Sequence, residues 1–292
     1  LNDTFTGAAG ASDVIYLVGD SQTVQDADFT NVTKIEKITT SNGTNNITLG
    51  TIADDSLAIA TIVGGTGADT INASSYAAEL TVSGGSGGDT ITTQSGDYSL
   101  SVDAGGGNDT IYVTGAELSS ADTVTGGAGD DTLSLADDSV TLVDAAFENI
   151  SQFENFSVGA GTNSITLGTK AAAAFASTFE GGAGNDTINA SAYTGSLTIA
   201  TGAGGDDKLV LGTAAGQINF EDATNQWDAN DTLTGGGGTD TIQLSDDSQT
   251  LVDADFTNVT NIEKLTTSNG TNNVTLGTVA DNSVLATVTG GS

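Results

Sequence analysis

A short motif rich in glycine and aspartate recurs along the chain, and it limits the possible folds more than any other feature. Its pattern is Gly-Gly-x-Gly-x-Asp-x-apolar, where the apolar residue is Ile or Leu. A weaker copy spans 202–209, and a degenerate copy with one extra residue spans 7–13. The close copies occupy 64–71, 84–91, 105–111, 126–133, 181–188 and 235–242. Such repetition within 292 residues predicts an array of stacked structural repeats.

Each position of the motif has a physical role in a turn that leads into a strand. The glycines permit a positive φ and a tight turn whose carbonyl groups point inward. The Asp supplies a hard anionic oxygen, which is the kind of ligand that Ca²⁺ prefers. The next two residues begin a strand, with Ile or Leu facing the core and Thr facing outward.

The composition excludes several classes of function. The chain has 38 Asp and Glu residues against 5 Lys and Arg, a net charge of −33, and no His, Cys, Pro or Met. Nucleic-acid binding requires a basic surface. Catalytic Ser-His-Asp or Cys-His groups and zinc sites require His or Cys. No apolar run approaches the roughly 20 residues of a membrane-spanning helix, and the abundance of Gly, Thr, Ser, Asn and Asp disfavours helices.

Two interpretations remain for such an acidic chain: disorder, or a fold completed by cations. The spacing favours the second, because the motif carboxylates recur at nearly equal intervals, at Asp69, Asp89, Asp109 and Asp131. If each interval is one coil, these carboxylates stack about 4.8 Å apart, and each neighbouring pair repels by roughly 1–3 kcal/mol. A divalent cation would relieve this repulsion. A metal-free solenoid that uses Asp and Gly only as turn formers is the alternative.

The motif resembles the RTX family of calcium-binding β-roll repeats. The resemblance implies an all-β parallel β-solenoid in which Ca²⁺ lies between stacked turns, held by Asp carboxylates and glycine carbonyls. Typical RTX rolls repeat the motif about every nine residues and hold calcium along both edges. Here it occurs once per coil, so we expect about 15 coils of roughly 20 residues, with calcium along one edge. The implied metal residues are Gly65, Gly67, Asp69, Gly85, Gly87, Asp89, Gly105, Gly107, Asp109, Gly127, Gly129, Asp131, Gly182, Gly184, Asp186, Gly205, Asp207, Gly236, Gly238, Asp240 and, least strongly, Asp13.

A second, longer repeat overlies the short one. Residues 26–50 and 253–277 differ at three of 25 positions, and a diverged third copy spans 144–168. We therefore predict one continuous solenoid over 1–292, with long units at approximately 1–119, 120–228 and 229–292, the last incomplete. Because the sequence starts and stops within a repeat, we expect it to be a fragment of a longer array.

The long repeat contains stretches without the calcium motif, and these require another source of cohesion. Phe29, Val32, Ile35 and Ile38 recur every three residues. This spacing predicts an arched turn or a single helical turn that caps the core; a contact patch is the alternative. Asn-rich segments such as 44–46 are expected to stack as amide ladders. Trp227 is expected to plug a loop against the core, with ligand stacking as the alternative.

The combined features predict a protein that acts outside the cell. RTX-like sites would be largely empty at cytosolic calcium and filled at millimolar levels, and the resemblance implies type I secretion. We expect a calcium-stabilised structural region of a bacterial cell-surface protein, such as an S-layer, sheath, filament or matrix protein. The alternative is an extender or ligand-binding region of an RTX adhesin. The acidic pairs 137–138 and 246–247 have no Arg or His beside them, so we expect no enzyme. Expected partners are calcium, further copies of the chain and outer-surface glycans.

Overall fold

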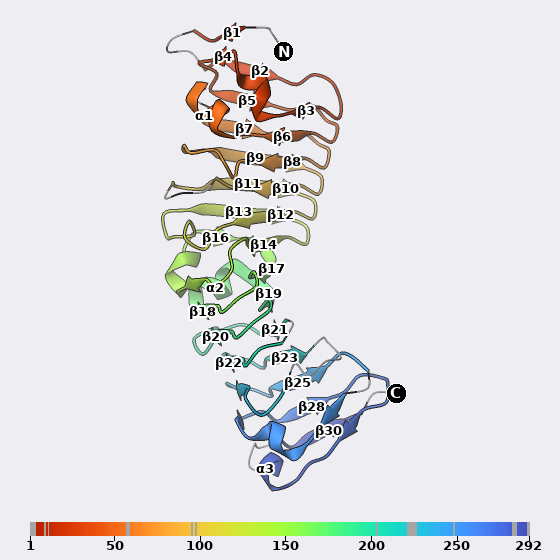
Figure 1. Ribbon diagram of the computed structural model, residues 1–292. Helices are drawn as coiled ribbons and strands as arrows, with labels where there is room; N and C mark the ends of the chain where they lie inside the picture. Colours follow the sequence, from red (N-terminus) through yellow and green to blue (C-terminus); the bar gives the residue numbers. More distant parts are fainter. Residues whose placement is uncertain are drawn as a thin grey trace. The chain divides into compact units, whose positions relative to one another are not determined.

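The computed structural model describes residues 4–8, 10, 12–56, 59–94, 96, 98–202, 204–220, 227–247, 249–281 and 285–290. The chain divides into two compact units. Unit 1 comprises Leu1–Ala136 with Asn149–Glu154, and unit 2 comprises Asp137–Glu148 with Asn155–Ser292. Both units consist mainly of short parallel strands (Figure 1). Within the described residues, no helix is long and apolar enough to cross a bilayer.

Two parallel sheets form unit 1, and the chain alternates between them. A short pair, β1 (Phe5–Thr6) and β4 (Val32–Thr33), accompanies them. The first sheet contains, in spatial order, β16 (Ile150–Ser151), β13 (Thr123–Ala128), β11 (Ser101–Gly106), β9 (Thr81–Ser86), β7 (Thr61–Val63), β5 (Lys37–Thr39) and β2 (Val14–Tyr16). The second contains β3 (Thr23–Val24), β6 (Asn46–Thr48), β8 (Thr70–Asn72), β10 (Thr90–Thr92), β12 (Thr110–Val113) and β14 (Thr132–Leu135).

The register stacks equivalent motif residues directly on one another. Ile71 pairs with Ile91, and Ile91 with Ile111. All three isoleucines are fully buried, whereas the threonines that precede them are partly exposed. The alternation of two residues therefore builds a solenoid core from the apolar position of each motif, as the sequence predicts. Leu80, Val82, Leu100 and Val102 are also buried.

Unit 2 repeats this architecture with two principal sheets. One contains β15 (Thr141–Leu142), β18 (Ser164–Thr166), β20 (Thr187–Asn189), β22 (Lys208–Val210), β24 (Thr232–Thr234) and β27 (Val259–Thr260). The other contains β19 (Phe175–Glu180), β21 (Thr198–Ala200), β23 (Gln217–Phe220), β25 (Thr241–Leu244), β28 (Lys264–Thr266) and β30 (Thr287–Thr289). β26 (Thr250–Leu251) pairs with β29 (Asn273–Val274), and β17 (Phe153–Ser157) spans the division between the units.

The predicted parallel β-solenoid is confirmed, but it has about 11 turns rather than 15. Several coils are longer than the motif spacing suggests. The strand pairing Thr61 with Thr81 closes a coil of the expected length, whereas Lys37 with Thr61 and Val124 with Ile150 close longer ones. The long repeat also contains short helices, which the composition did not suggest. These are η1 (Asp26–Phe29), α1 (Thr51–Ser56), η2 (Asp144–Phe147), α2 (Thr169–Ala174), η3 (Asp253–Phe256) and α3 (Thr278–Asp281).

Apolar packing holds the stretches that lack the calcium motif. Phe29, Val32, Ile35 and Ile38 are all buried, so the predicted packing of these side chains against the core is confirmed. Only Phe29 belongs to a helical turn, η1, whereas Val32 lies in β4 and Ile38 in β5. Trp227 is buried in unit 2 as the expected plug. It stacks on Phe220, with ring centroids 5.6 Å apart, and meets Phe256 edge-on at 4.9 Å. Residues 221–226 of the same insert lie outside the described residues.

One aspartate in each copy of the long repeat ties two successive coils together. Asp144 Oδ1 accepts hydrogen bonds from the backbone N–H groups of Gly168 at 2.7 Å and Ala171 at 2.9 Å, at the start of α2. Asp26 and Asp253 make the equivalent bonds to α1 and α3. These bonds, above all the one from Ala280, lower the pKa of Asp253. No motif in the sequence predicts this role.

Replacing Asp144 with Ala should lower the free energy of unfolding by about 2–4 kcal/mol, because several backbone N–H groups lose a charged acceptor. The matched control is Glu148→Ala, which removes the surface ion pair with Lys170 and should change stability by less than about 1 kcal/mol. Chemical denaturation of both variants measures the difference. Equal losses would show that Asp144 is not an anchor.

Candidate metal centre

The motif aspartates of unit 1 form a buried ladder that runs from coil to coil. Asp69, Asp89, Asp109 and Asp131 each precede a strand of the second sheet, and each is at most 1% exposed. Asp89 Oδ1 accepts the backbone N–H of Asp69 at 2.7 Å. Asp109 and Asp131 do the same for the aspartate before them, at 2.7 and 2.8 Å. The predicted alignment of these aspartates is therefore present, and it uses one oxygen of each carboxyl group.

The second carboxyl oxygen of the ladder is the unusual feature. Oδ2 of Asp89, Asp109 and Asp131 is buried and has no hydrogen-bond partner, and the same holds for Asp186 in unit 2. Burial raises the pKa of Asp89 from 3.8 to about 7, and the neighbouring carboxyls of Asp109 and Asp69 contribute to this rise. Burial likewise raises the pKa of Asp109 and of Asp131. Each turn that carries such an aspartate, which we call a corner, therefore requires a proton or a cation.

Unit 2 contains a second ladder of the same kind. Asp207 Oδ1 accepts the N–H of Asp186 at 2.8 Å, and Asp231 Oδ1 accepts the N–H of Asp207 at 2.7 Å. Burial raises the pKa of Asp207 to about 7, and the pKa values of Asp186 and Asp231 to about 6. Asp231 was not among the predicted site residues, because no glycine turn precedes it. The Asp-Thr-Leu sequence that it begins was the available signal.

The motif aspartates do not keep to one edge of each unit, so the predicted single edge is wrong for them. In unit 1, Asp13 precedes β2 of the first sheet, and its Oδ2 accepts the N–H of Ala8 at 2.6 Å. In unit 2, Asp240 precedes β25, whereas Asp186 and Asp207 precede strands of the other sheet. The physical reason is spacing: the interval from Asp207 to Asp240 exceeds one coil and moves the motif to the opposite corner.

The motif glycines allow successive turns to approach closely. Gly105 and Gly107 have φ values of +106° and +131°, and a Cβ on either would collide with the carbonyl oxygen of Gly85 or Gly87 in the preceding coil. The other predicted glycines would likewise place a Cβ against backbone of the preceding coil. These are Gly65, Gly67, Gly85, Gly87, Gly127, Gly129, Gly182, Gly184, Gly205, Gly236 and Gly238.

An asparagine occupies the same ladder position where the calcium motif is missing. Asn45 Oδ1 accepts the N–H of Gln22 at 3.1 Å. Its Nδ2 donates to the carbonyl oxygens of Ser41 at 3.2 Å and Gly43 at 2.5 Å, and to Asp69 Oδ1 at 2.9 Å. The expected amide ladder is therefore wrong for Asn45, which bonds to an aspartate rather than to another asparagine. The Gly-Thr-Asn sequence that the copies of the long repeat share was the available signal for this ladder position.

Glutamates continue the hydrogen-bonded ladder beyond the aspartates. The N–H of Asp131 donates to Glu154 Oε2 at 2.8 Å, and the N–H of Asp240 donates to Glu263 Oε2 at 2.8 Å. Both glutamates belong to copies of the long repeat, and neither was among the predicted site residues. Each lies one coil further along and accepts the same backbone group that an aspartate accepts elsewhere in the ladder.

The chemistry of these corners fits a hard cation held by oxygen. The available donors are carboxylate oxygens and the carbonyl groups of glycine turns, a set that suits Ca²⁺. Among the described residues, no three acidic, His or Cys side chains converge on one point. A cation at a corner would therefore be held by one or two carboxylates together with turn carbonyls.

Comparison with known protein families agrees with this chemistry. A family model described as the RTX calcium-binding nonapeptide repeat matches residues 60–75, 101–115, 118–142, 173–192 and 228–248. The chain carries RTX calcium-binding repeats. The matched RTX segments contain the motifs of Asp69, Asp109, Asp131, Asp186 and Asp240. A search of curated proteins found no match, and a search of solved structures found none either.

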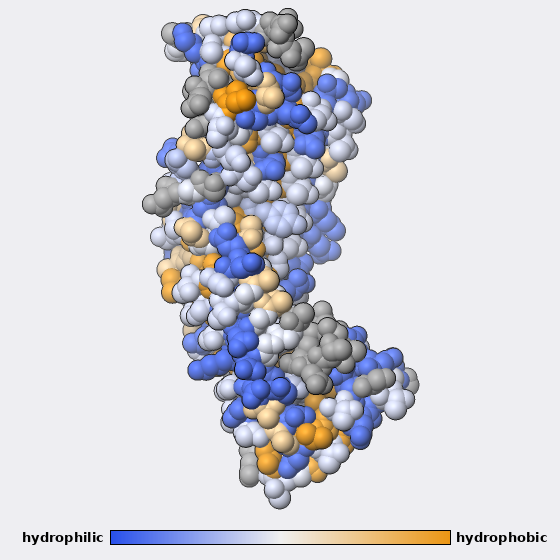
Figure 2. Space-filling model, in the orientation of Figure 1, coloured by the Kyte–Doolittle hydropathy of each residue, from blue (hydrophilic) through white to orange (hydrophobic). Residues whose placement is uncertain are grey.

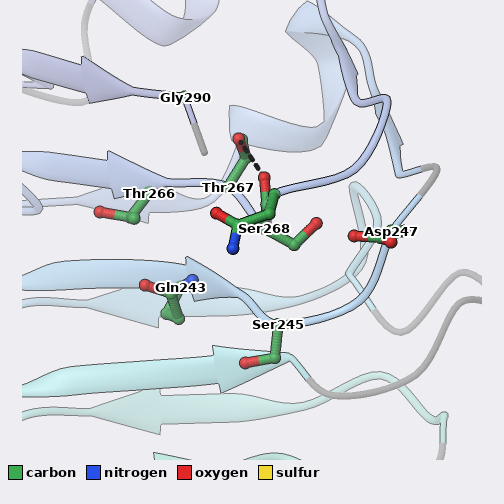
Figure 3. A pocket seen from close by; sticks show the side chains of 8 residues that line it. Gln243, Ser245, Asp247, Thr266, Thr267, Ser268 and Gly290 are labelled. Atoms are coloured by element: carbon green, nitrogen blue, oxygen red, sulfur yellow. Dashed lines mark hydrogen bonds between the residues drawn. The ribbon is translucent and has the colours of Figure 1, made fainter. Parts of the chain in front are cut away.

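A surface hollow in unit 2 is separate from the RTX corners. Its volume is about 690 Å³, and hydroxyl and amide side chains line it together with Asp247 (Figure 3). Thr267 Oγ1 donates to the carbonyl oxygen of Ser268 within it. None of the motif aspartates lines this hollow. The visible face of the molecule is predominantly polar (Figure 2), so the buried ladders remain the candidate site.

In the presence of a chelator, the stability of the chain should fall as the pH rises from about 5 to about 7.5. The folded state keeps protons on Asp89 and Asp207 up to a pH of about 7. A carboxyl whose pKa is raised by folding stabilises the fold below its unfolded pKa, and this contribution is lost as the pH rises through the folded value. Melting temperatures measured across this range test the prediction.

Saturating calcium provides the control for this measurement. Calcium binds ionised carboxylates, so the decline should disappear when calcium is present. If the melting temperature in chelator rises steadily from pH 5 to 7.5, the assignment of raised pKa values would be contradicted.

Proposed function

We propose that this chain is a calcium-stabilised structural region of a secreted bacterial cell-surface protein, such as an S-layer, sheath, filament or matrix protein. The observation that supports it most is the row of buried, unpartnered Oδ2 atoms on Asp89, Asp109 and Asp131. Lys37, Lys264 and the other lysines cannot neutralise the acidic groups of the chain, because it holds only 5 basic residues against 38 acidic ones. Calcium would supply the missing positive charge.

The residues that would hold calcium are those of the stacked corners. In unit 1 these are the ladder aspartates together with the carbonyl groups of the motif glycines. In unit 2 they are Asp186, Asp207 and Asp231, and Asp240 at the opposite corner. Bound calcium supplies positive charge and up to eight coordination positions for oxygen. Because the unfolded chain does not hold these oxygens together, calcium binding stabilises the folded state.

Calcium dependence suggests where such a region would fold. Extracellular modules commonly bind calcium with dissociation constants of about 10⁻⁴–10⁻³ M, far above cytosolic calcium. A chain with a net charge of −33 would be much less stable without cations and would gain stability after export, where calcium is abundant. This supports secretion, for which we propose the type I pathway. The near-identical long repeats and the absence of His and Cys from the sequence support a structural role without catalysis.

Calcium titration of the metal-free protein tests the proposal. We expect β-type circular dichroism and the melting temperature to increase together as calcium reaches millimolar concentration. Magnesium at the same concentration should have a much smaller effect, because it dehydrates reluctantly and requires near-ideal octahedral geometry. A melting temperature that is the same in calcium and in chelator would overturn the proposal.

Electron microscopy of the calcium-loaded protein distinguishes the structural role from its alternative. Ordered sheets or filaments support the lattice or filament role. Isolated particles at all concentrations would instead favour an extender of a large RTX adhesin. Attachment to outer-surface glycans remains a prediction that sedimentation with purified cell-wall polysaccharide would test.

A further inference from the structure

We infer that the residue at the ladder position decides whether a corner takes calcium, and that Asn45, Asn163 and Asn272 form corners in which an amide group replaces the ion. The calcium half of this inference rests on the proposed function, whereas the amide half rests on hydrogen bonds alone. Each asparagine belongs to one copy of the long repeat. Each copy would therefore contain a metal-independent corner.

The three asparagines make the same contacts with their own turns. Asn163 Nδ2 donates to the carbonyl oxygens of Gly159 at 3.0 Å and Gly161 at 3.3 Å, which lie four and two residues before it. Asn272 Nδ2 donates to the carbonyl oxygens four and two residues before it, those of Ser268 at 3.2 Å and Gly270 at 3.1 Å. Asn45 bonds to its turn in the same way. The amide nitrogen thus ties two inward-facing carbonyl groups together.

The amide also donates a hydrogen bond to the carboxylate in the next coil. Asn163 Nδ2 lies 2.9 Å from Asp186 Oδ1, and Asn45 Nδ2 lies 2.9 Å from Asp69 Oδ1. In each case the backbone N–H of the same asparagine bonds to the same oxygen, at 2.8 and 2.7 Å. The nitrogen therefore contacts three oxygens: two turn carbonyls and one carboxylate. A calcium ion at an aspartate corner would use the equivalent oxygens together with further ones, since Ca²⁺ takes six to eight oxygen ligands.

The register shows that aspartate and asparagine corners are equivalent. Asn46 pairs with Thr70, and Thr70 with Thr90, so Asn45, Asp69 and Asp89 hold one position in successive coils. The Oδ1 atom accepts a backbone N–H from the preceding coil in all of them. The remaining atom differs, because an amide nitrogen donates to the surrounding oxygens and a carboxylate oxygen cannot.

This difference explains where the unpartnered atoms occur. Oδ2 is buried without a partner in Asp89, Asp109, Asp131 and Asp186. In contrast, the Nδ2 of Asn163 and the Nδ2 of Asn45 are each fully engaged, although both side chains are at most 1% exposed. An asparagine corner is therefore complete without a metal, whereas the corners of these four aspartates are not. Asp69 and Asp240 differ from them, because their Oδ2 atoms accept the backbone N–H groups of Gly65 and Gly236 in their own turns.

Isosteric substitutions at Asp109 test the inference, because Asp89 and Asp131 flank it in the ladder. Asp109→Asn should raise the melting temperature in chelator by about 2–4 °C, since the new amide would bond to the turn and to Asp131. It should also reduce the number of bound calcium ions measured by calorimetry. The control Asp109→Ala removes the same carboxylate without supplying a donor, and it should lower the melting temperature in chelator.

The reverse substitution, Asn163→Asp, should have opposite effects. It should lower the melting temperature in chelator and add a calcium site that restores it. The amide half would be overturned if Asp109→Asn lowered the melting temperature in chelator as much as Asp109→Ala does. Asn163→Asp without an added ion would overturn the calcium half. If the unsubstituted protein binds no calcium, the proposed function fails. Stabilisation by Asp109→Asn in chelator would still support the amide half of the inference.

Discussion

The structure depends on how it neutralises the carboxylates that stack in its interior, because the chain has few basic side chains. One oxygen of each ladder aspartate is satisfied by a backbone N–H of the preceding coil, and this bond fixes the register between coils. The other oxygen is buried and unpartnered in Asp89, Asp109, Asp131 and Asp186. Burying an ionised group without a partner is strongly unfavourable. Folding of the motif-rich coils is therefore coupled to a proton or a cation.

The regions between the calcium motifs are held together without a cation. In unit 1, Asn45 replaces an aspartate of the ladder and needs no ion. In unit 2, an aromatic cluster surrounds Phe156, whose ring lies 5.0–5.3 Å from those of Phe147, Phe175 and Phe179. Asp144 ties η2 to α2 through backbone N–H groups. Each long repeat thus combines a metal-independent section with a section that is incomplete until its charge is neutralised.

The sequence predicts the parallel solenoid and its core well, because a period of two and the Gly-Asp motif are local signals. Ile71, Ile91 and Ile111 lie where the motif places them. The number of coils and the edge of each corner depend on the loop length between motifs, which local patterns do not reveal. Asp240 therefore lies at an unpredicted corner. The role of Asn45 emerges only from the register, since Asn is also a common turn residue.

Crystals grown in calcium would test the central claim most directly, through the anomalous scattering of calcium at the corners. The account predicts peaks within about 2.6 Å of the carboxylate oxygens of Asp89, Asp109 and Asp131. It predicts no peak at the amide nitrogens of Asn45 and Asn163. Aspartate corners without ions in calcium-saturated crystals, or ions beside the asparagines, would contradict it.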